Sequence, residues 1–134
     1  MSHAWLSDTH APLAREAALG LKAMGWTLDG GTDADVRVEF LDADTLPSAN
    51  FQAGDRESSV VLVAPATTRL YLSELSLKVQ GLAIAQAPAR RINAIVVEAA
   101  QADRLAFTIN WLAGAQMVTG QIILLSDKPA PTLL

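Results

Sequence analysis

The residues best suited to bind a metal ion lie near the N-terminus. His3 and His10 stand on either side of Asp8, and imidazole nitrogens together with a carboxylate oxygen can coordinate a divalent cation. The chain has 2 histidines in all, and His3 is close to the terminus. Ordinary polar loop residues explain this pattern better than a metal centre does, so we predict no metal site here.

A second group of candidate ligands is acidic. Carboxylates gathered in one stretch of chain could hold Ca²⁺ or Mg²⁺. Their spacing, however, lacks the central glycine and the terminal glutamate of an EF-hand loop. A solvated loop is therefore the better interpretation of these residues, which are Asp33, Asp35, Asp42 and Asp44.

The overall composition narrows the class of protein. With 51% hydrophobic and 18% charged residues, the chain is too apolar to be disordered, yet no apolar run approaches the roughly 18 residues of a membrane span. The net charge is −4 and no basic cluster exceeds Arg90-Arg91, which argues against nucleic acid as a partner. The absence of cysteine excludes disulfides and thiol nucleophiles. No charged segment followed by an apolar one opens the sequence, so we expect a cytoplasmic location.

The elements that must position any site alternate between strand and helix. Short apolar segments predict strands at residues 4–7, 36–41, 60–64, 92–97 and 120–125. Helical spacing of apolar residues predicts helices at 12–25, 69–87 and 101–116, the first capped by Asp8 or Thr9. The polar segment 42–58 is predicted to be a long connection. Together these features predict one α/β domain over residues 1–134, a three-layer sandwich around a mostly parallel sheet of about five strands.

Two motifs near the C-terminus resemble those of a known family. Arg91-Ile92-Asn93-Ala94-Ile95 is followed, one predicted helix later, by Met117-Val118-Thr119-Gly120-Gln121-Ile122-Ile123-Leu124. This order is similar to the C-terminal half of short-chain dehydrogenases/reductases, and the resemblance covers about residues 60–127. It implies a Rossmann-like fold and a nicotinamide dinucleotide cofactor. Full members of the family are longer, so it also implies deleted elements, mainly between residues 29 and 58.

This chain departs most clearly from the family's pattern in the loop that binds the cofactor. The resembled glycine-rich loop would fall on Ser7, Asp8, Thr9, His10, Ala11 and Pro12, where no glycine is present. Glycines let the backbone approach the pyrophosphate at a helix N-terminus. Here Pro12 removes an amide donor and Asp8 adds negative charge where a phosphate would bind. We therefore predict that the chain has no nicotinamide cofactor.

The catalytic residues that the resemblance implies are also missing. Members of the family use a tyrosine as general acid/base, a lysine four residues later, and a serine. Aligned on Gly81-Leu82, the tyrosine position holds Leu72 and the lysine position holds Ser76, while the serine position falls near Ala64. Tyr71 is one residue away from the required place and no lysine stands four residues after it. These degenerate positions predict a protein without catalytic residues.

A second apolar stripe on the last predicted helix is the strongest candidate for a contact surface. Leu105, Ile109 and Leu112 already supply a face for the core. The additional stripe can be core as well, or it can be a subunit interface, where tryptophan is enriched. The resemblance implies the latter, because the corresponding helix and last strand of the family pack against a neighbouring subunit. The predicted interface residues are Phe107, Trp111, Ala115, Gly120, Ile122 and Leu124, and segment 70–86 is a second candidate.

Three functions are compatible with these observations. The leading hypothesis is a non-catalytic, shortened subunit that assembles with a full-length reductase or with itself. The second is a small-ligand binding module at the carboxyl ends of the strands, lined by residues 7–9, 64–67 and 98–99. The third, and least favoured, is an atypical reductase that uses Tyr71. In none of them do we expect a nucleic-acid or membrane partner.

Overall fold

Strands and helices alternate through the described part of the computed structural model, which comprises residues 3–8, 10–28, 34–42, 45–47 and 59–127. The first half contains β1 (His3–Leu6), α1 (Pro12–Ala23), β2 (Thr27–Leu28) and β3 (Val36–Phe40). The second half contains β4 (Ser59–Pro65), α2 (Arg69–Gln86), β5 (Arg91–Val97), a 3₁₀ helix η1 (Ala99–Arg104), α3 (Leu105–Gly114) and β6 (Ile122–Leu125). No helix in these ranges combines the length and the apolar character needed to cross a bilayer.

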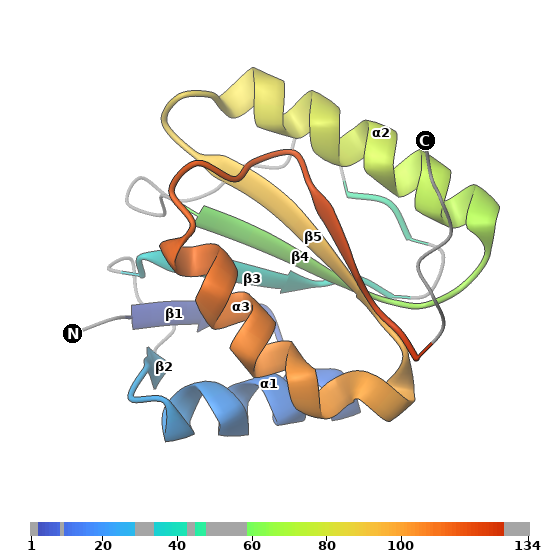
Figure 1. Cartoon of the computed structure of the whole chain (residues 1–134). Coiled ribbons are helices and arrows are strands. Elements are labelled where there is room, and N and C mark those ends of the chain that lie inside the picture. The colour runs from blue at the N-terminus through green and yellow to red at the C-terminus, as the bar shows by residue number, and fades with distance from the viewer. Residues whose placement is uncertain (1–2, 9, 29–33, 43–44, 48–58, 128–134) are drawn as a thin grey trace.

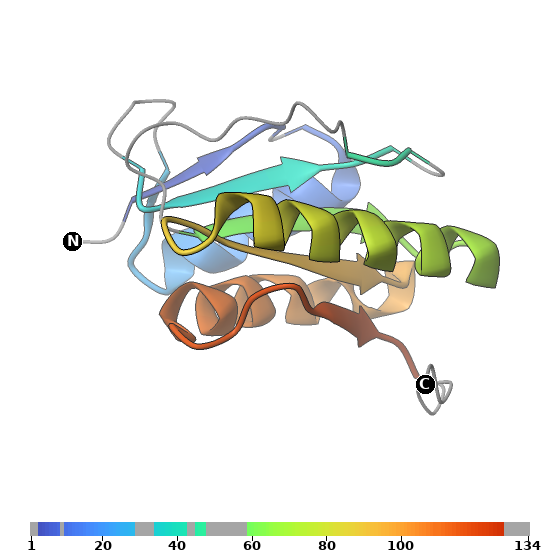
Figure 2. The same ribbon diagram turned by 90° about the horizontal axis from the view of Figure 1, so that it is seen from above.

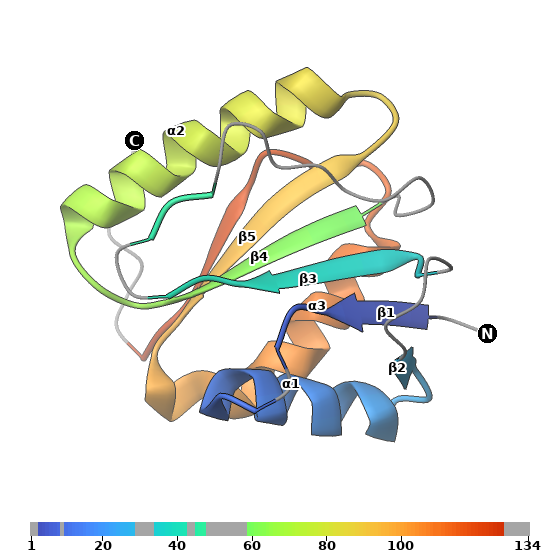
Figure 3. The same cartoon turned by 180° about the vertical axis from the view of Figure 1, so that it is seen from behind.

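The strands form one sheet in which every described pair is parallel, in the order β2-β1-β3-β4-β5-β6. The chain leaves β1 towards β2 on one side and then continues with β3 on the other side, as Figure 3 shows. The direction of winding therefore reverses between β1 and β3. This reversal is the topological switch point of a doubly wound, Rossmann-like sheet.

Helices cover both faces of the sheet and give it two cores. α1 and α3 lie on one face and α2 lies on the other (Figure 1). Along β4, Val61 and Val63 face the first core whereas Val60 and Leu62 face the second, as expected for side chains that alternate across a strand. Because both faces are buried, the strand is a continuous apolar run rather than an alternating one.

The two helices on the first face pack closely because one of them presents a glycine. A Cβ built on Gly20 of α1 would overlap the Cβ of Ala106 on α3. The close approach buries Ala17 and Leu21 of α1 against the same core as Ile109 of α3. It also fixes the position of α3, whose outer face matters below.

The three-layer α/β architecture predicted from the sequence is confirmed, with differences in detail. The described residues form six strands instead of about five, because β2 is only 2 residues long and too short to show a periodic pattern. The segment 101–116 is not one α-helix, since its first turns form η1 and α3 ends at Gly114. β6 begins later than Gly120, whose φ of 76° breaks the extended conformation.

The predicted cap of α1 by Asp8 or Thr9 needs correction for Asp8. The N-cap residue is Ala11, which makes no side-chain hydrogen bond, and Pro12 occupies the first helical turn. Thr9 lies outside the described residues. By contrast, α2 has a side-chain cap, because the hydroxyl of Thr68 accepts a hydrogen bond from the Tyr71 amide at 3.2 Å.

Candidate functional site

A cavity of about 830 Å³ opens at the carboxyl ends of the strands, beside the switch point. Ligands of open α/β sheets bind in such crevices. Of the predicted rim residues, Asp8, Pro65, Ala66, Glu98 and Ala99 line it, whereas Ser7, Ala64 and Thr67 do not, and Thr9 lies outside the described residues. Sequence reasoning missed the contribution of the first turns of α1 and of the end of β3, namely Ala11, Pro12, Leu13, Ala14, Arg15, Glu16, Phe40, Leu41 and Asp42.

At the start of α1, a side chain of the protein itself uses the amide groups. Oδ1 of Asp8 accepts hydrogen bonds from the amides of His10 at 2.7 Å and Ala11 at 3.4 Å. Pro12, the next residue, has no amide hydrogen to offer. A carboxylate therefore lies immediately before the helix N-terminus, close to where the helix dipole otherwise attracts a bound anion.

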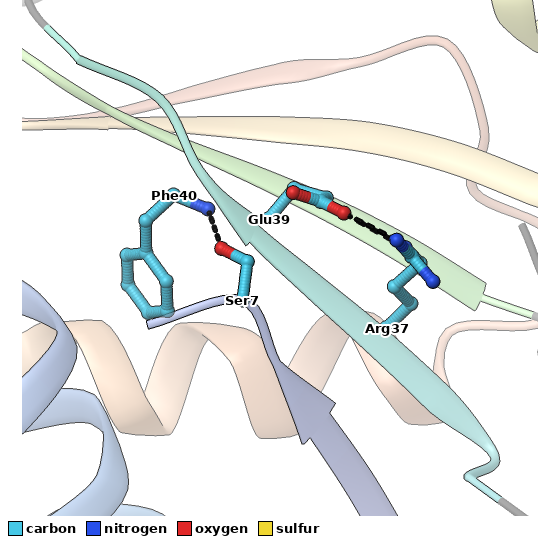
Figure 4. A network of polar contacts seen from close by, with 4 residues as sticks. All are labelled: Ser7, Arg37, Glu39 and Phe40. Atoms are coloured by element: carbon cyan, nitrogen blue, oxygen red, sulfur yellow. Dashed lines mark hydrogen bonds and ion pairs between the residues drawn. The ribbon is translucent and has the colours of Figure 1, made fainter. Parts of the chain in front are cut away.

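The end of β1 is tied directly to the end of β3. The hydroxyl of Ser7 accepts a hydrogen bond from the Phe40 amide at 2.8 Å (Figure 4). The Ser7 amide donates to the Val38 carbonyl at 2.9 Å. These bonds extend the β1–β3 pairing into the crevice. Ser7, which the sequence placed in a degenerate cofactor loop, thus joins two strands.

Further along β3, an ion pair lies on the sheet face opposite to α1 and α3. Arg37 and Glu39 are two residues apart, and an Nη2–Oε1 distance of 2.6 Å joins them (Figure 4). The Arg37 guanidinium also stacks on the Trp5 ring, 4.1 Å from its centroid. The two charges thus interact with each other on the sheet, and neither Arg37 nor Glu39 lines the cavity.

The residues at the degenerate catalytic positions do not line the cavity. Tyr71 is buried with 4% of its surface exposed, and its hydroxyl donates a 2.7 Å hydrogen bond to the Thr45 carbonyl. Leu72 and Ser76 are half-buried on α2, and Ala64 is buried in β4. None of these residues lines the 830 Å³ cavity.

The candidate metal ligands do not come together either. His3 begins β1 whereas His10 and Asp8 follow its end, so the strand separates the two imidazoles. Asp35 precedes β3 and Asp42 follows it, while Asp33 and Asp44 lie outside the described residues. Among the residues that the structure describes, no group of three or more potential ligands could hold a metal ion.

The two recognisable motifs form a hydrogen-bonded clasp between β5 and the loop before β6. The Asn93 side chain donates to the Val118 carbonyl at 3.0 Å and accepts from the Gln121 amide at 3.1 Å. The Ile92 amide donates to the Thr119 hydroxyl at 3.0 Å. The residue types that carry the resemblance therefore hold the last strand in register, and they lie away from the cavity.

Comparison with known proteins agrees with this architecture. The family model described as short chain dehydrogenase-like protein matches residues 26–125. The chain belongs to this family. A search among curated proteins found no matching relative.

A solved structure has the fold of this short-chain dehydrogenase-like chain. The crystal structure of an oxidoreductase (short chain dehydrogenase/reductase) from Brucella ovis superposes with a TM-score of 0.67 at 12% sequence identity. The match covers 94% of this chain and 100% of that chain. At this identity the likeness concerns the fold.

The fold family implies a nicotinamide dinucleotide, but the residues at the switch point of this member do not fit one. A dinucleotide brings a negatively charged pyrophosphate to the start of α1, where the carboxylate of Asp8 already accepts two amide hydrogens. The cavity lining adds the carboxylates of Glu16, Asp42 and Glu98 against the single guanidinium of Arg15. This mostly acidic set of side chains repels a polyanion instead of binding it.

The predicted interface residues of this family member lie on α3, in the loop that follows it, and in strand β6. Phe107 and Trp111 project from the outer face of α3 and are 66% and 50% exposed, so they do not belong to the core. Ala115 and Gly120 are half-buried in the following loop, and Ile122 and Leu124 pack towards the core beneath α2. Contact with a partner stays a prediction for all six.

Proposed function

We propose that this chain is a non-catalytic member of the short-chain dehydrogenase-like family that assembles with a catalytic reductase subunit or with itself. The observation that carries the proposal is the outer face of α3, where Phe107 and Trp111 stand one helical turn apart and at least half exposed. Large aromatic side chains are the commonest energetic anchors of protein interfaces.

The surroundings of this aromatic pair support an interface. Met117, in the loop after α3, is 95% exposed and is a third large apolar side chain in this part of the sequence. The neighbouring strand β6 lies at the end of the sheet order and pairs with β5 alone among the described strands. An apolar edge strand and exposed aromatic side chains each favour association with another chain.

The absence of catalysis is inferred from the chemistry of the site. The carboxylate of Asp8 lies just before the helix N-terminus that would receive a cofactor phosphate, and the remaining acidic side chains of the cavity also oppose a polyanion. An atypical reductase based on Tyr71 finds no support, because the phenol is buried and donates its hydrogen bond to the Thr45 carbonyl. A role in stabilising or shaping a catalytic partner needs neither a bound cofactor nor a catalytic tyrosine.

The native mass of the chain, purified from its own host, tests this proposal. We expect recovery in a fixed ratio with a full-length reductase, or a self-assembled oligomer. Trp111→Ser is expected to weaken the assembly by a factor of about 30 or more, as removal of a hot-spot residue does. Leu19→Ser is the matched control, because Leu19 is 61% exposed on α1. A monomer without a partner, or equal weakening by both variants, contradicts the proposal.

A second function, binding of a small ligand, is favoured by one observation, the cavity of about 830 Å³. This volume is within the usual range for small-molecule sites. A ligand recovered from the host and identified by native mass spectrometry should stabilise the chain by about 2.7 kcal/mol at a hundredfold excess over its Kd. Ala66→Trp, at an exposed lining position, should abolish the stabilisation; an unchanged effect excludes this cavity as its site.

A further inference from the structure

The cavity of about 830 Å³ beside the switch point, which we call the switch-point cavity, is lined by carboxylates from separate elements. Asp8 follows β1, Glu16 lies in α1, Asp42 follows β3 and Glu98 follows β5. The described strands are all parallel, so the arrows of β1, β3 and β5 point to one edge of the sheet (Figure 2). The fold, and not a local acidic run in the sequence, therefore gathers these four side chains around one cavity.

The positive charge in the lining is smaller than the negative charge. Among the described lining residues, Arg15 is the one basic side chain, against four carboxylates. Its guanidinium is also engaged by the neighbouring loop, because Nη2 donates a hydrogen bond to the His10 carbonyl at 3.4 Å. A negative lining repels anions and attracts cations. The charge of the cavity thus selects a positively charged ligand.

Much of the remaining lining is apolar and suits a hydrocarbon chain. Leu13, Phe40 and Val97 line the cavity and lie in or against the first core. The hydroxyl of Ser7 accepts a hydrogen bond from the Phe40 amide, which fixes the backbone that carries this aromatic ring. Methylene groups gain free energy when such a surface removes them from water, and an ammonium group is attracted to an aromatic face. A ligand with both kinds of group matches this lining.

The spacing of the carboxylates favours an elongated cation over a metal ion. In the sheet order, β1 and β3 are adjacent and β5 lies two places beyond β3. With strands about 4.8 Å apart, the strand ends before Asp8 and Glu98 are separated by about 14 Å. A metal ion needs its ligands within about 2–2.6 Å of one point, and no three potential ligands in the described ranges could hold one. A chain of ammonium groups joined by methylenes can instead meet carboxylates placed at intervals.

We propose that the switch-point cavity binds an aliphatic polyamine, with its ammonium groups near the carboxylates that follow β1, β3 and β5 and its methylene groups on the apolar lining. The inference rests on the small-ligand function proposed above and names the chemical class of the ligand. It also gives Ser126 a positioning role, because its hydroxyl donates a 2.6 Å hydrogen bond to Oε1 of Glu98 and so orients that carboxylate. The ligand's charge is opposite in sign to that of a dinucleotide.

Calorimetric titration of the full chain with spermidine tests the proposal. We expect one spermidine to bind per chain. Butylamine, which has a methylene chain but a single ammonium group, should bind at least about tenfold more weakly, because it meets one carboxylate instead of several. NAD⁺ should give no measurable binding. Absence of spermidine binding, equal binding of butylamine, or tighter binding of NAD⁺ overturns the proposal.

Variants that remove a charge and keep the shape of the side chain locate the binding site. Asp42→Asn and Glu98→Gln should each weaken spermidine binding by about 3–10-fold, the range of partly exposed ion pairs. The amide oxygen of Glu98→Gln can still accept the hydrogen bond from Ser126. Glu74→Gln is the matched control, because it removes the same charge from an exposed position on α2, outside the cavity lining. An equal loss in all three variants contradicts binding in the cavity.

Two further variants separate this inference from the functions proposed above. Trp111→Ser, on the outer face of α3, should leave the affinity for spermidine unchanged, so failure of assembly and failure of this inference give different results. Ala66→Trp should abolish spermidine binding, because Ala66 lines the cavity. If the host ligand were neutral or anionic and lost its binding in Ala66→Trp, the small-ligand function would hold and the polyamine proposal would be wrong.

Discussion

Replacing Asn93 by leucine lowers the free energy of unfolding by about 2–5 kcal/mol. Asn93 is fully buried, and its side chain pairs with both the Val118 carbonyl and the Gln121 amide. Leucine branches at Cγ as asparagine does but is larger and cannot form hydrogen bonds, so it leaves one partly buried acceptor and one partly buried donor without the side-chain partner, and each costs about 1–3 kcal/mol. Urea unfolding followed by tryptophan fluorescence measures the change.

Gln121→Ala is the matched control for this prediction. The Gln121 side chain is exposed and only its backbone takes part in the clasp, so the substitution should change stability by less than about 0.5 kcal/mol. A loss below about 1 kcal/mol for Asn93→Leu would contradict the clasp as the device that holds β6.

This clasp gives a structural reason for the two motifs that carry the family resemblance. Asn93 and Thr119 lie in the two motifs that carry the resemblance, and both make hydrogen bonds within the scaffold. The clasp positions the loop that leads to β6 at the edge of the sheet. The two motifs therefore report how the last strand is placed.

Much of the fold could be predicted because its strands are buried on both faces. Val60–Ala64 is apolar at every position, a pattern that parallel strands between helices produce. The end of α1 was visible in Gly25, whose φ is 93°. β2 could not be predicted, since its Thr27–Leu28 is defined by pairing with β1 and not by any local pattern.

The lining residues of the candidate site that could be predicted are those whose position depends on the strand topology alone. Residues after β4 and β5 reach the cavity because parallel strands end at one edge. The lining by Leu13 and Glu16 depends on how α1 packs, which no local pattern encodes. Which residues of β6 face which core could not be predicted either. All four residues of the strand are apolar, so the sequence does not show the alternation that places Ile122 and Ile123 in opposite cores.

Arg91→Met lowers stability by about 2–4 kcal/mol, because it removes the positive charge at the C-terminus of α3. The Arg91 guanidinium donates to the carbonyls of Leu112 at 3.3 Å, Ala113 at 3.2 Å and Ala115 at 2.6 Å. α3 has no basic residue in its own last turn, so this strand residue supplies what the helix lacks. Methionine retains most of the aliphatic stem and none of the donors.

The same substitution should reach the proposed interface. Arg91 holds the end of the helix that displays Phe107 and Trp111, so a frayed α3 should weaken assembly in addition to lowering Tm by roughly 8–15 °C. The stability of Arg91→Lys should lie between that of the unaltered protein and that of Arg91→Met, since an ammonium cannot reach three carbonyls as a planar guanidinium does. Arg104→Met, which removes an exposed arginine bonded to Gln101, should cost less than about 0.5 kcal/mol. If Arg91→Met matched that control in calorimetry, the guanidinium would not be what secures α3, and the rigidity of the aromatic surface would have to come from the close contact of α3 with Gly20 of α1.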